Sequence, residues 1–407
     1  GPLLTGGEGA CGFDIDGKKF LDFTGQISLL NTGYCPKEVI SALKQMSGKL
    51  PACISADYPY YVKITANKKK KEISRVALAE RLIAITSKVM PFKKRVYFEV
   101  SGATAVNAAL KIAKITVLRK RGIKTEDFQN LFEKDIFIPS QEELCKFSIL
   151  GFRNAFHGRP GEPQCLTNSK IRQLWAASSS CAFGRLPFPS HKINLQIFWN
   201  NINGTISKLE NFAPIVAFLF EPIQGEGGIN VPEGDFLKAL VDHLKLRGIC
   251  IIADEVQTGF GRTGKMFACE HFDIQPDMMV LSKSLGAGLA IGAVVVNDDM
   301  FPDLEPGMHS GSHHADPMAV AGAIANIDMI VENNLIDRSC CYGAYAIKRL
   351  EEIAKEFPMA ITGVRGLGLI IGIEFISVNF RDNVIKECFR NGLLIASSGT
   401  KAIRMTP

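Results

Sequence analysis

Residues 249–264 read ICIIADEVQTGFGRTG. Ile249–Ala253 is a short, wholly apolar run of the kind that forms a buried strand, and the acids Asp254 and Glu255 follow it directly. Ligands bind at the carboxyl ends of parallel strands, so this position predicts that Asp254 faces a ligand. Capping of the next turn is the alternative for Asp254. A metal site is less expected, because no His or Cys pair stands nearby in the sequence.

A lysine stands in the corresponding place after the next apolar run. Residues 278–288 read MMVLSKSLGAG, in which Lys283 follows the run Met278–Leu281 and precedes a glycine-rich turn. A lysine there is costly unless it reaches the surface or is paired or covalently bonded. Together with Asp254 it predicts a site for pyridoxal phosphate, in which the lysine forms a Schiff base and the acid keeps the ring nitrogen protonated.

The phosphate of such a cofactor needs backbone N–H donors. Ser101–Thr104 (SGAT) lies between a strand predicted at Val96–Val100 and a helix predicted at Ala105–Leu118. Small residues at a helix N-terminus present N–H groups and the positive end of the helix dipole to an anion. An ordinary helix start shows the same pattern, so this segment alone does not separate the two.

A fourth segment, Phe156–Arg159 (FHGR), follows a strand predicted at Ser148–Phe152. An aromatic ring at that place can stack on a cofactor ring, and the guanidinium of Arg159 can bind a carboxylate. Core packing is the alternative for Phe156.

Apolar runs and helical stretches alternate from about residue 95 onward. Ile215–Phe220 and Gly292–Val296 are further runs of buried-strand type, and Glu233–Arg247 is the clearest helix between strands. This alternation predicts an α/β fold with a mostly parallel sheet covered by helices on both faces.

Both ends of the chain have a different pattern. Residues 316–356 read as helical with a pause near 334, and strands and a helix follow from Leu369 onward. With a β-hairpin expected at residues 10–23 around Asp16–Gly17, these segments predict a small α+β lobe. The run Lys68–Lys71 is interpreted as a solvated loop, with contact to phosphate or nucleic acid as the less favoured alternative.

Composition narrows the class of protein. The 407 residues are 46% hydrophobic and 22% charged, which excludes wholesale disorder, and no uncharged apolar run approaches the length of a membrane span. A net charge of +6 is weak support for nucleic acid binding and suits an anionic cofactor equally well. The 11 cysteines form no CxxC pair, which favours reduced thiols in a cytoplasmic setting. An organelle stays open, because the N-terminus looks incomplete.

Eight segments, in order along nearly the whole chain, resemble the class III (ω-amino acid) aminotransferases, which are pyridoxal-phosphate enzymes of fold type I. The SGA and FHGR motifs bring the chain closest to the 4-aminobutyrate aminotransferases. The matching segments are Asp14–Asp22 (DIDGKKFLD), Asn31–Gly33, Ser101–Lys111 (SGATAVNAALK), Phe156–Arg159, Glu221–Gly228 (EPIQGEGG), Ala253–Gly264, Ser282–Gly288 and Val364–Glu374 (VRGLGLIIGIE).

The resemblance implies a domain plan. A large cofactor-binding domain with a central, mostly parallel seven-stranded sheet would span residues 51–298. Residues 1–50 and 299–407 would together form a small α+β domain.

The resemblance also implies cofactor contacts. Lys283 would bond the cofactor and move a proton at the substrate carbon, Asp254 would bond the pyridine nitrogen, and Gln257 the phenolic oxygen. The other implied contacts are the backbone N–H groups of Gly102 and Ala103 on the phosphate, Phe156 and Val256 on the two ring faces, His157, and Ser312 on the phosphate of a neighbouring subunit.

For the substrate, the resemblance implies that Arg159 binds the carboxylate distant from the reacting amine. Glu226 and Arg404 would form an ion pair that opens when an α-carboxylate binds and stays closed for an ω-amine. Ile27 falls where the family lines the substrate pocket, and no metal is implied.

Four features depart from the family's pattern. Gly33–Pro36 (GYCP) replaces Gly-His-x-His-Pro, Gln26 stands beside Ile27, and Thr104 replaces a common glutamate. The segment that serves the partner subunit reads SHHADP from Ser312 to Pro317. Its His313 and His314 are interpreted as polar surface or interface residues, with contact to phosphate or substrate as the alternative and a metal pair as the least expected reading.

The function implied is transfer of the amino group of an ω-amino acid (4-aminobutyrate-like, with ornithine or lysine also possible) to 2-oxoglutarate by a ping-pong mechanism. A homodimer with sites at the subunit interface is expected, and neither nucleic acid nor a membrane is an expected partner. The alternative is an amino-acid racemase or epimerase on the same scaffold. A non-catalytic sensor or scaffold is the least favoured reading, because all the chemical residues are present.

Overall fold

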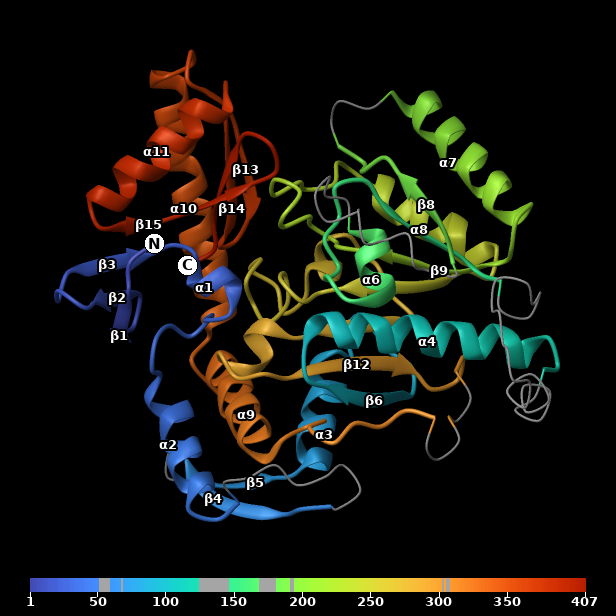
Figure 1. Cartoon of the computed structure of the whole chain (residues 1–407), viewed down its shortest axis with the longest axis horizontal. Helices are drawn as coiled ribbons and strands as arrows, with labels where there is room; N and C mark the ends of the chain where they lie inside the picture. Colours follow the sequence, from blue (N-terminus) through green and yellow to red (C-terminus); the bar gives the residue numbers. More distant parts are fainter. Residues whose placement is uncertain are drawn as a thin grey trace, which may run out of the picture.

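A seven-stranded sheet forms the centre of the computed structural model, which describes residues 1–50, 59–66, 69–123, 146–167, 181–190, 194–301, 304 and 308–407 (Figure 1). Its strands, in spatial order, are β6 (Lys94–Glu99), β12 (Gly292–Asn297), β11 (Met278–Leu281), β10 (Cys250–Asp254), β9 (Ile215–Phe220), β7 (Ser148–Phe152) and β8 (Ala182–Leu186). Of the seven strands, β12 alone runs opposite to the others, so the predicted mostly parallel sheet is confirmed.

Helices cover both faces of this sheet, as the alternating pattern predicts. Successive residues of a strand point to opposite faces, and in β10 Ile252 packs with the helix α4 (Gly102–Lys120) while Ile251 packs in the opposite core. That opposite core is closed by α3 (Arg75–Ile85), α7 (Leu195–Glu210), α8 (Phe236–Leu246) and α9 (Pro317–Glu332). Strands buried from both sides explain why their sequences are continuous apolar runs.

The two ends of the chain meet in a four-stranded sheet at the left of Figure 1. β2 (Cys11–Asp14) and β3 (Lys19–Asp22) form the expected hairpin, β1 (Leu4–Glu8) extends it, and β15 (Leu393–Leu394) pairs with β3 in parallel. The domain boundaries at residues 50 and 298 stay a prediction.

The C-terminal part contributes a second four-stranded sheet. It has the order β13 (Ile361–Leu367), β14 (Ile370–Phe375), β17 (Ala402–Met405) and β16 (Ala396–Ser398), and it packs with α10 (Leu335–Glu356) and α11 (Val378–Arg390). The pause predicted near residue 334 is confirmed, because Asn334, with φ 51°, separates α9 from α10.

The lysine run is not the solvated loop that the sequence predicts. Lys69–Lys71 belong to β5 (Lys69–Ile73), which pairs antiparallel with β4 (Val62–Ala66). Alternation along the strand turns Lys71 inward, where it is 8% exposed and its Nζ lies 2.7 Å from Oδ2 of Asp328 on α9. An acidic partner on a distant helix, which sequence neighbours do not reveal, accounts for the difference.

The remaining elements are short helices and turns that connect the strands described above. They are α1 (Gly25–Ser28), α2 (Lys37–Ser47), α6 (Gly161–Leu166) and the 3₁₀ turns Ala268–His271 and Lys283–Gly286. Residues 124–145, most of an insertion that the sequence indicates at 119–147, lie outside the described residues.

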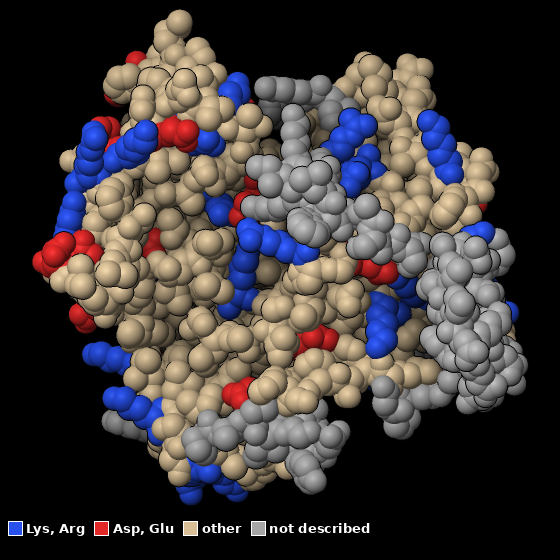
Figure 2. All heavy atoms as spheres, viewed as in Figure 1, with Lys and Arg blue, Asp and Glu red and all other residues tan. Residues whose placement is uncertain are grey.

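Surface charge matches the modest net charge. Figure 2 shows Lys and Arg spread over one face with Asp and Glu among them, rather than gathered in one patch. Among the helices that the structure describes, none combines the length and apolar character needed to cross a membrane.

Candidate active site

A cavity of about 570 Å³ lies at the carboxyl ends of β10 and β11. It brings together nearly all the residues singled out in the sequence. The predicted residues that line it are Ile27, Gly102, Ala103, Phe156, His157, Arg159, Glu226, Asp254, Val256, Gln257 and Lys283. Arg404 does not line the cavity but lies behind its wall, where it donates a hydrogen bond to Glu226. Ser312 is exposed and also lies outside the lining.

Lys283 begins the turn that follows β11, with a φ of 42° in the left-handed region. Loss of hydration lowers the pKa of its amine to about 8, and the positive charge of Arg404 adds to that shift. An amine with a pKa this close to neutrality is a far better nucleophile than an ordinary lysine. Left-handed backbone at a non-glycine residue is strained, and such strain is typical of functional positions.

Asp254 ends β10 and is held by two groups. Its Oδ2 lies 2.7 Å from Nδ1 of His157, and its Oδ1 accepts the backbone N–H of Val256 at 3.1 Å. The side chain of His157 is fully buried, and its Nε2 has no hydrogen-bond partner among the described residues. A carboxylate fixed in this way can face a cationic nitrogen in the cavity without turning away.

The N-terminus of α4 forms the opposite wall. Ser101 caps the helix and exchanges hydrogen bonds with Thr104, so the departure at Thr104 completes a capping box. The first N–H groups of a helix have no acceptor inside it, which leaves those of Gly102 and Ala103 for an anion. A Cβ at Gly102 would lie 3.0 Å from both methyl groups of Val256, so only glycine fits this approach comfortably.

Glu226 and Arg404 form the expected ion pair, with 2.9 Å between Oε1 and Nη1. Arg404 lies on β17 and is 4% exposed, whereas Glu226 reaches into the cavity from the loop after β9. Arg159, in contrast, is exposed at the rim of the cavity. One guanidinium group, that of Arg159, thus lies at the rim, and a second, that of Arg404, lies behind the wall and is paired with Glu226.

The wall around Ile27 is an unusual turn. Residues 25–28 all have positive φ, with values of 50°, 51°, 62° and 65°. Two departures from the family pattern hold this turn together, because the amide of Gln26 donates to Tyr34 Oη and to Asp22 Oδ2. The hydroxyl of Tyr34 also donates to Asp22, at 2.7 Å.

Gln257 is positioned from two sides. Its Nε2 donates to Oγ of Ser28 at 3.1 Å, and a Cβ at Gly225 would lie only 1.6 Å from its Oε1. Glycine at position 225 is therefore required for Gln257 to occupy its place in the cavity.

Sequence reasoning assigned no role to Glu221, which is buried in the cavity wall. It accepts the backbone N–H groups of Phe156 and Gly225, each at 2.9 Å. Burial, with the nearby charge of Asp254, raises its pKa to about 7. Glu221 directly follows the apolar strand β9, so the rule that singled out Asp254 after β10 could have found it.

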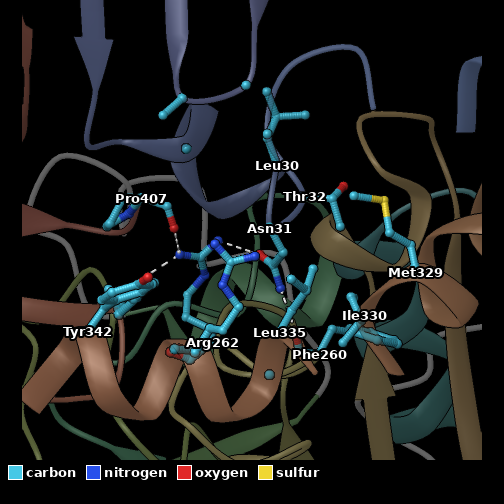
Figure 3. Close-up of a pocket in the computed structure, with 18 of the residues that line it drawn as sticks. Leu30, Asn31, Thr32, Phe260, Arg262, Met329, Ile330, Leu335, Tyr342 and Pro407 are labelled. Atoms are coloured by element: carbon cyan, nitrogen blue, oxygen red, sulfur yellow. Dashed lines mark hydrogen bonds between the residues drawn. The ribbon is translucent and has the colours of Figure 1, made fainter. Parts of the chain in front are cut away.

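A second cavity, of about 390 Å³, is lined by Leu30–Tyr34, Phe260–Arg262 and residues of α9 and α10 (Figure 3). Arg262 is buried in its wall, donates to the carbonyl of Pro407 at 2.7 Å and hydrogen-bonds Asn31 Oδ1. The same oxygen accepts the hydroxyl of Ser284, next to Lys283. Arg262 therefore ties both ends of the chain to the turn that presents the lysine.

Comparison with known proteins supplies the family. Residues 3–407 match the sequence model of the family described as "Aminotransferase class-III". The chain belongs to this family. It is thus an aminotransferase that depends on pyridoxal phosphate, and its fold is that of the fold-type-I enzymes.

This aminotransferase is similar to several named proteins. It is 32% identical over 405 residues to the acetylornithine aminotransferase of Methanocaldococcus jannaschii, covering 100% of this chain and 88% of that one. It is 31% identical over 414 residues to the mitochondrial ornithine aminotransferase of Arabidopsis thaliana, covering 100% and 76%. The crystal structure of the ornithine aminotransferase of Toxoplasma gondii ME49 matches with a TM-score of 0.77 and 25% identity, over 100% of this chain and 85% of that one.

The cavity of the aminotransferase fits its cofactor by chemistry as well as by family. The helix N-terminus offers donors to a phosphate, Asp254 offers a fixed negative charge, and Lys283 offers an amine with a lowered pKa. The unpartnered Nε2 of His157 is a further polar atom at this wall that a bound group can satisfy.

Proposed function

We propose that this aminotransferase transfers the ω-amino group of an ω-amino acid to 2-oxoglutarate by a ping-pong mechanism. The observation that carries the proposal is the ion pair of Glu226 and Arg404, at 2.9 Å, on the cavity that also holds Lys283. In a ping-pong mechanism one site accepts two unlike substrates in turn, and an ion pair that opens for one of them and stays closed for the other is suited to that task.

Bound pyridoxal phosphate supplies an electron sink that weakens the C–H bond of the amine-bearing carbon. The N–H groups of Gly102 and Ala103 bind the phosphate, and Phe156 and Val256 hold the ring between them. Asp254, oriented by His157, stabilises the proton on the ring nitrogen. The amine of Lys283 is the base that takes and returns the proton at the substrate carbon.

Arg404 and Arg159 bind different carboxylates of the substrates. With an ω-amine in the site, Glu226 stays paired with Arg404 and offsets its charge, and the distant carboxylate binds Arg159 at the rim. With 2-oxoglutarate, Arg404 leaves Glu226 and binds the α-carboxylate in a bidentate fashion, while Arg159 binds the distal carboxylate.

For the amine donor we propose the ornithine class, meaning ornithine or N-acetylornithine. The names of the relatives support this choice over 4-aminobutyrate, which the SGA and FHGR motifs suggest, and over lysine. All four donors carry a primary amine several carbons away from a carboxylate, so the site geometry suits each of them.

A donor panel tests the proposal. Each amine is incubated with the holoenzyme and 2-oxoglutarate, and glutamate is measured; Lys283→Ala is the control that removes the essential amine. Glutamate from ornithine or N-acetylornithine at the highest kcat/KM is the expected result. Lack of transfer from every ω-amine would contradict the proposal. A loss of optical rotation from one amino acid without any keto acid would support the racemase, which the family description does not favour.

We also propose a homodimer in a reducing, cytoplasmic setting. Ser312 is exposed and lies outside the lining of this chain's cavity, which suits a contact with the phosphate in a second copy. The nine cysteines that the structure describes are free thiols, in keeping with a reducing compartment. Sedimentation of the wild type, and cofactor affinity of Ser312→Ala, test the dimer and the shared site.

A further inference from the structure

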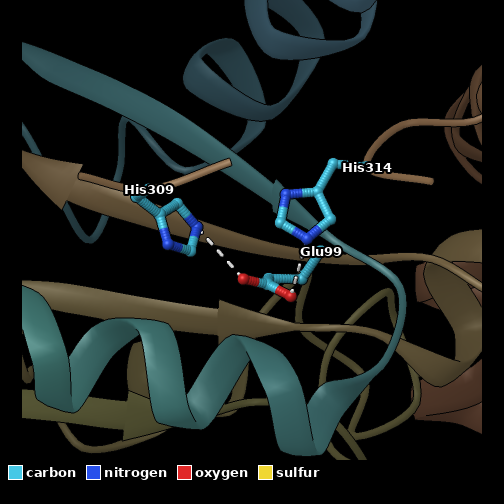
Figure 4. Close-up of side chains that lie close together, drawn as sticks. All are labelled: Glu99, His309 and His314. Carbon is cyan, nitrogen blue, oxygen red and sulfur yellow. Dashed lines mark ion pairs between the residues drawn. The ribbon is translucent and has the colours of Figure 1, made fainter. Parts of the chain in front are cut away.

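Three side chains of metal-ligand type converge at the end of the edge strand β6 (Figure 4). Nε2 of His309 lies 3.0 Å from Oε1 of Glu99, and Nε2 of His314 lies 3.3 Å from Oε2. The three ligand atoms all lie within 4.8 Å of one another. In a tetrahedral site with bonds of about 2.0–2.2 Å, neighbouring ligand atoms are roughly 3.3–3.6 Å apart. The two separations from Glu99 are therefore close to those of a metal site.

The cluster is sheltered from solvent. The side chains of Glu99, His309 and His314 are 6%, 11% and 15% exposed, and the ring of Tyr97 packs edge-on against His309 at 5.8 Å. The adjacent His313 is exposed and takes no part. The sequence shows the adjacent pair His313–His314, but in the structure only His314 faces Glu99, and it does so together with His309.

The orientation of His309 favours an ion over a simple hydrogen bond. Its Nε2 is buried and makes no hydrogen bond of ordinary geometry with the described residues, although Oε1 of Glu99 is only 3.0 Å away. When a metal is bound, the imidazole lone pair points at the ion, which lies beside the line that joins two ligand atoms. A carboxylate held by two N–H donors would instead have both N–H groups aimed at its oxygens.

We propose that Glu99, His309 and His314 form a binding site for a divalent transition-metal ion such as Zn²⁺. Two imidazoles and one carboxylate are ligands for Zn²⁺, Co²⁺, Ni²⁺ or Fe²⁺, whereas Mg²⁺ and Ca²⁺ prefer oxygen ligands alone. Three protein ligands leave at least one position for water. The ion would fasten the segment before α9 to the end of β6, three residues ahead of Gly102 in the phosphate-binding turn.

Zinc binding to the holoenzyme tests the site. The enzyme with its cofactor bound is freed of metal by a chelator, dialysed, and brought to equilibrium with Zn²⁺, and bound zinc is measured per chain. The variants are His309→Ala, His314→Ala and Glu99→Gln, with His313→Ala as the matched control on the exposed neighbour. The absorbance of the bound cofactor and thermal unfolding show whether each variant is folded.

One zinc ion per chain is expected in the wild type and in His313→Ala. Each of the three ligand variants should lose more than about 10–100-fold in zinc affinity, because changes to groups outside the ligand set already cause losses of that size. Failure of the wild type to bind saturably would overturn the proposal. Zinc bound equally by all four variants would also overturn it and would locate the ion elsewhere, for example at the exposed thiols of Cys35 and Cys340. If one ligand variant fails to fold, the other two still decide the question.

Discussion

Nη1 of Arg404 lies 2.9 Å from Oε1 of Glu226, and this pair joins β17 to the loop after β9 across 178 residues of sequence. Arg404 is buried and has its counter-ion supplied by a side chain that also faces the substrate cavity. Any substrate carboxylate that reaches Arg404 must therefore compete with Glu226.

Replacement of Glu226 with alanine should change the choice of substrate. With Arg404 permanently free, substrates that carry an α-carboxylate should gain over ω-amines by up to about 2–5 kcal/mol, the range for one partner of a buried charge pair. The ratio of kcat/KM values for an α-amino acid and an ω-amine measures the effect. Glu226→Asp is the control that keeps the charge, and an unchanged ratio in Glu226→Ala would contradict the switch.

The lowered pKa of Lys283 predicts the pH dependence of cofactor binding. Only the neutral amine attacks the aldehyde, so the rate at which the cofactor-free protein binds pyridoxal phosphate should rise with pH and level off above about 8. Stopped-flow absorbance of the cofactor gives this profile.

Two variants should shift that profile in opposite directions. Arg404→Gln removes a positive charge that lowers the pKa of Lys283, so the midpoint should move to higher pH. Glu226→Gln removes a negative charge that raises this pKa, so the midpoint should move to lower pH. Shifts of the same sign, or none, would show that these charges do not act on the amine.

Asp254→Asn should impair catalysis with little change in shape. The amide cannot hold a proton on the ring nitrogen, so kcat should fall by about 10²–10⁴, the usual range for loss of a proton-handling group. His157→Gln, which leaves the carboxylate in place, should fall less. Single-turnover absorbance separates the chemical step from substrate binding, and equal losses in the two variants would assign the effect to geometry rather than to charge.

Glu221 should make stability depend on pH. Its folded-state pKa of about 7 exceeds the ordinary value of 4.5, so the folded protein binds the extra proton between these two values. The associated stability is fully present below about 4.5 and is lost as pH rises through about 7. Urea unfolding at several pH values should show a steeper decline for the wild type than for Glu221→Gln. Parallel curves would rule out Glu221 as the source.

The apolar runs predicted much of the sheet, because a strand buried on both faces has a continuous apolar sequence. Ile215–Phe220 and Met278–Leu281 were predicted with the bounds of β9 and β11. β8 was missed, since Gly184 and Arg185 interrupt its apolar run at the sheet edge. α7 was also missed: asparagines and a glycine lower its helix propensity, and packing of Phe198 and its neighbours against the core holds the helix instead.

The cofactor site was predictable because each of its charged residues follows a buried strand or stands in a family motif. Asp254 and Lys283 could be found from the strand ends alone. The cluster of Glu99, His309 and His314 could not, since more than 200 residues separate Glu99 from the two histidines and only the fold brings them together. The partner of Lys71 was hidden for the same reason, because Asp328 lies on a distant helix.

The pairing of β3 with β15 has a consequence for how the protein is made. Leu21 and Asp22 leave the ribosome first, whereas Leu393 and Leu394, which complete their sheet, emerge more than 350 residues later. At synthesis rates of about 5–20 residues per second, the first hairpin waits roughly 20–70 s with an open edge. Arg404 arrives later still, so the enzyme cannot pair Glu226, or choose between its substrates, until β17 has been synthesised.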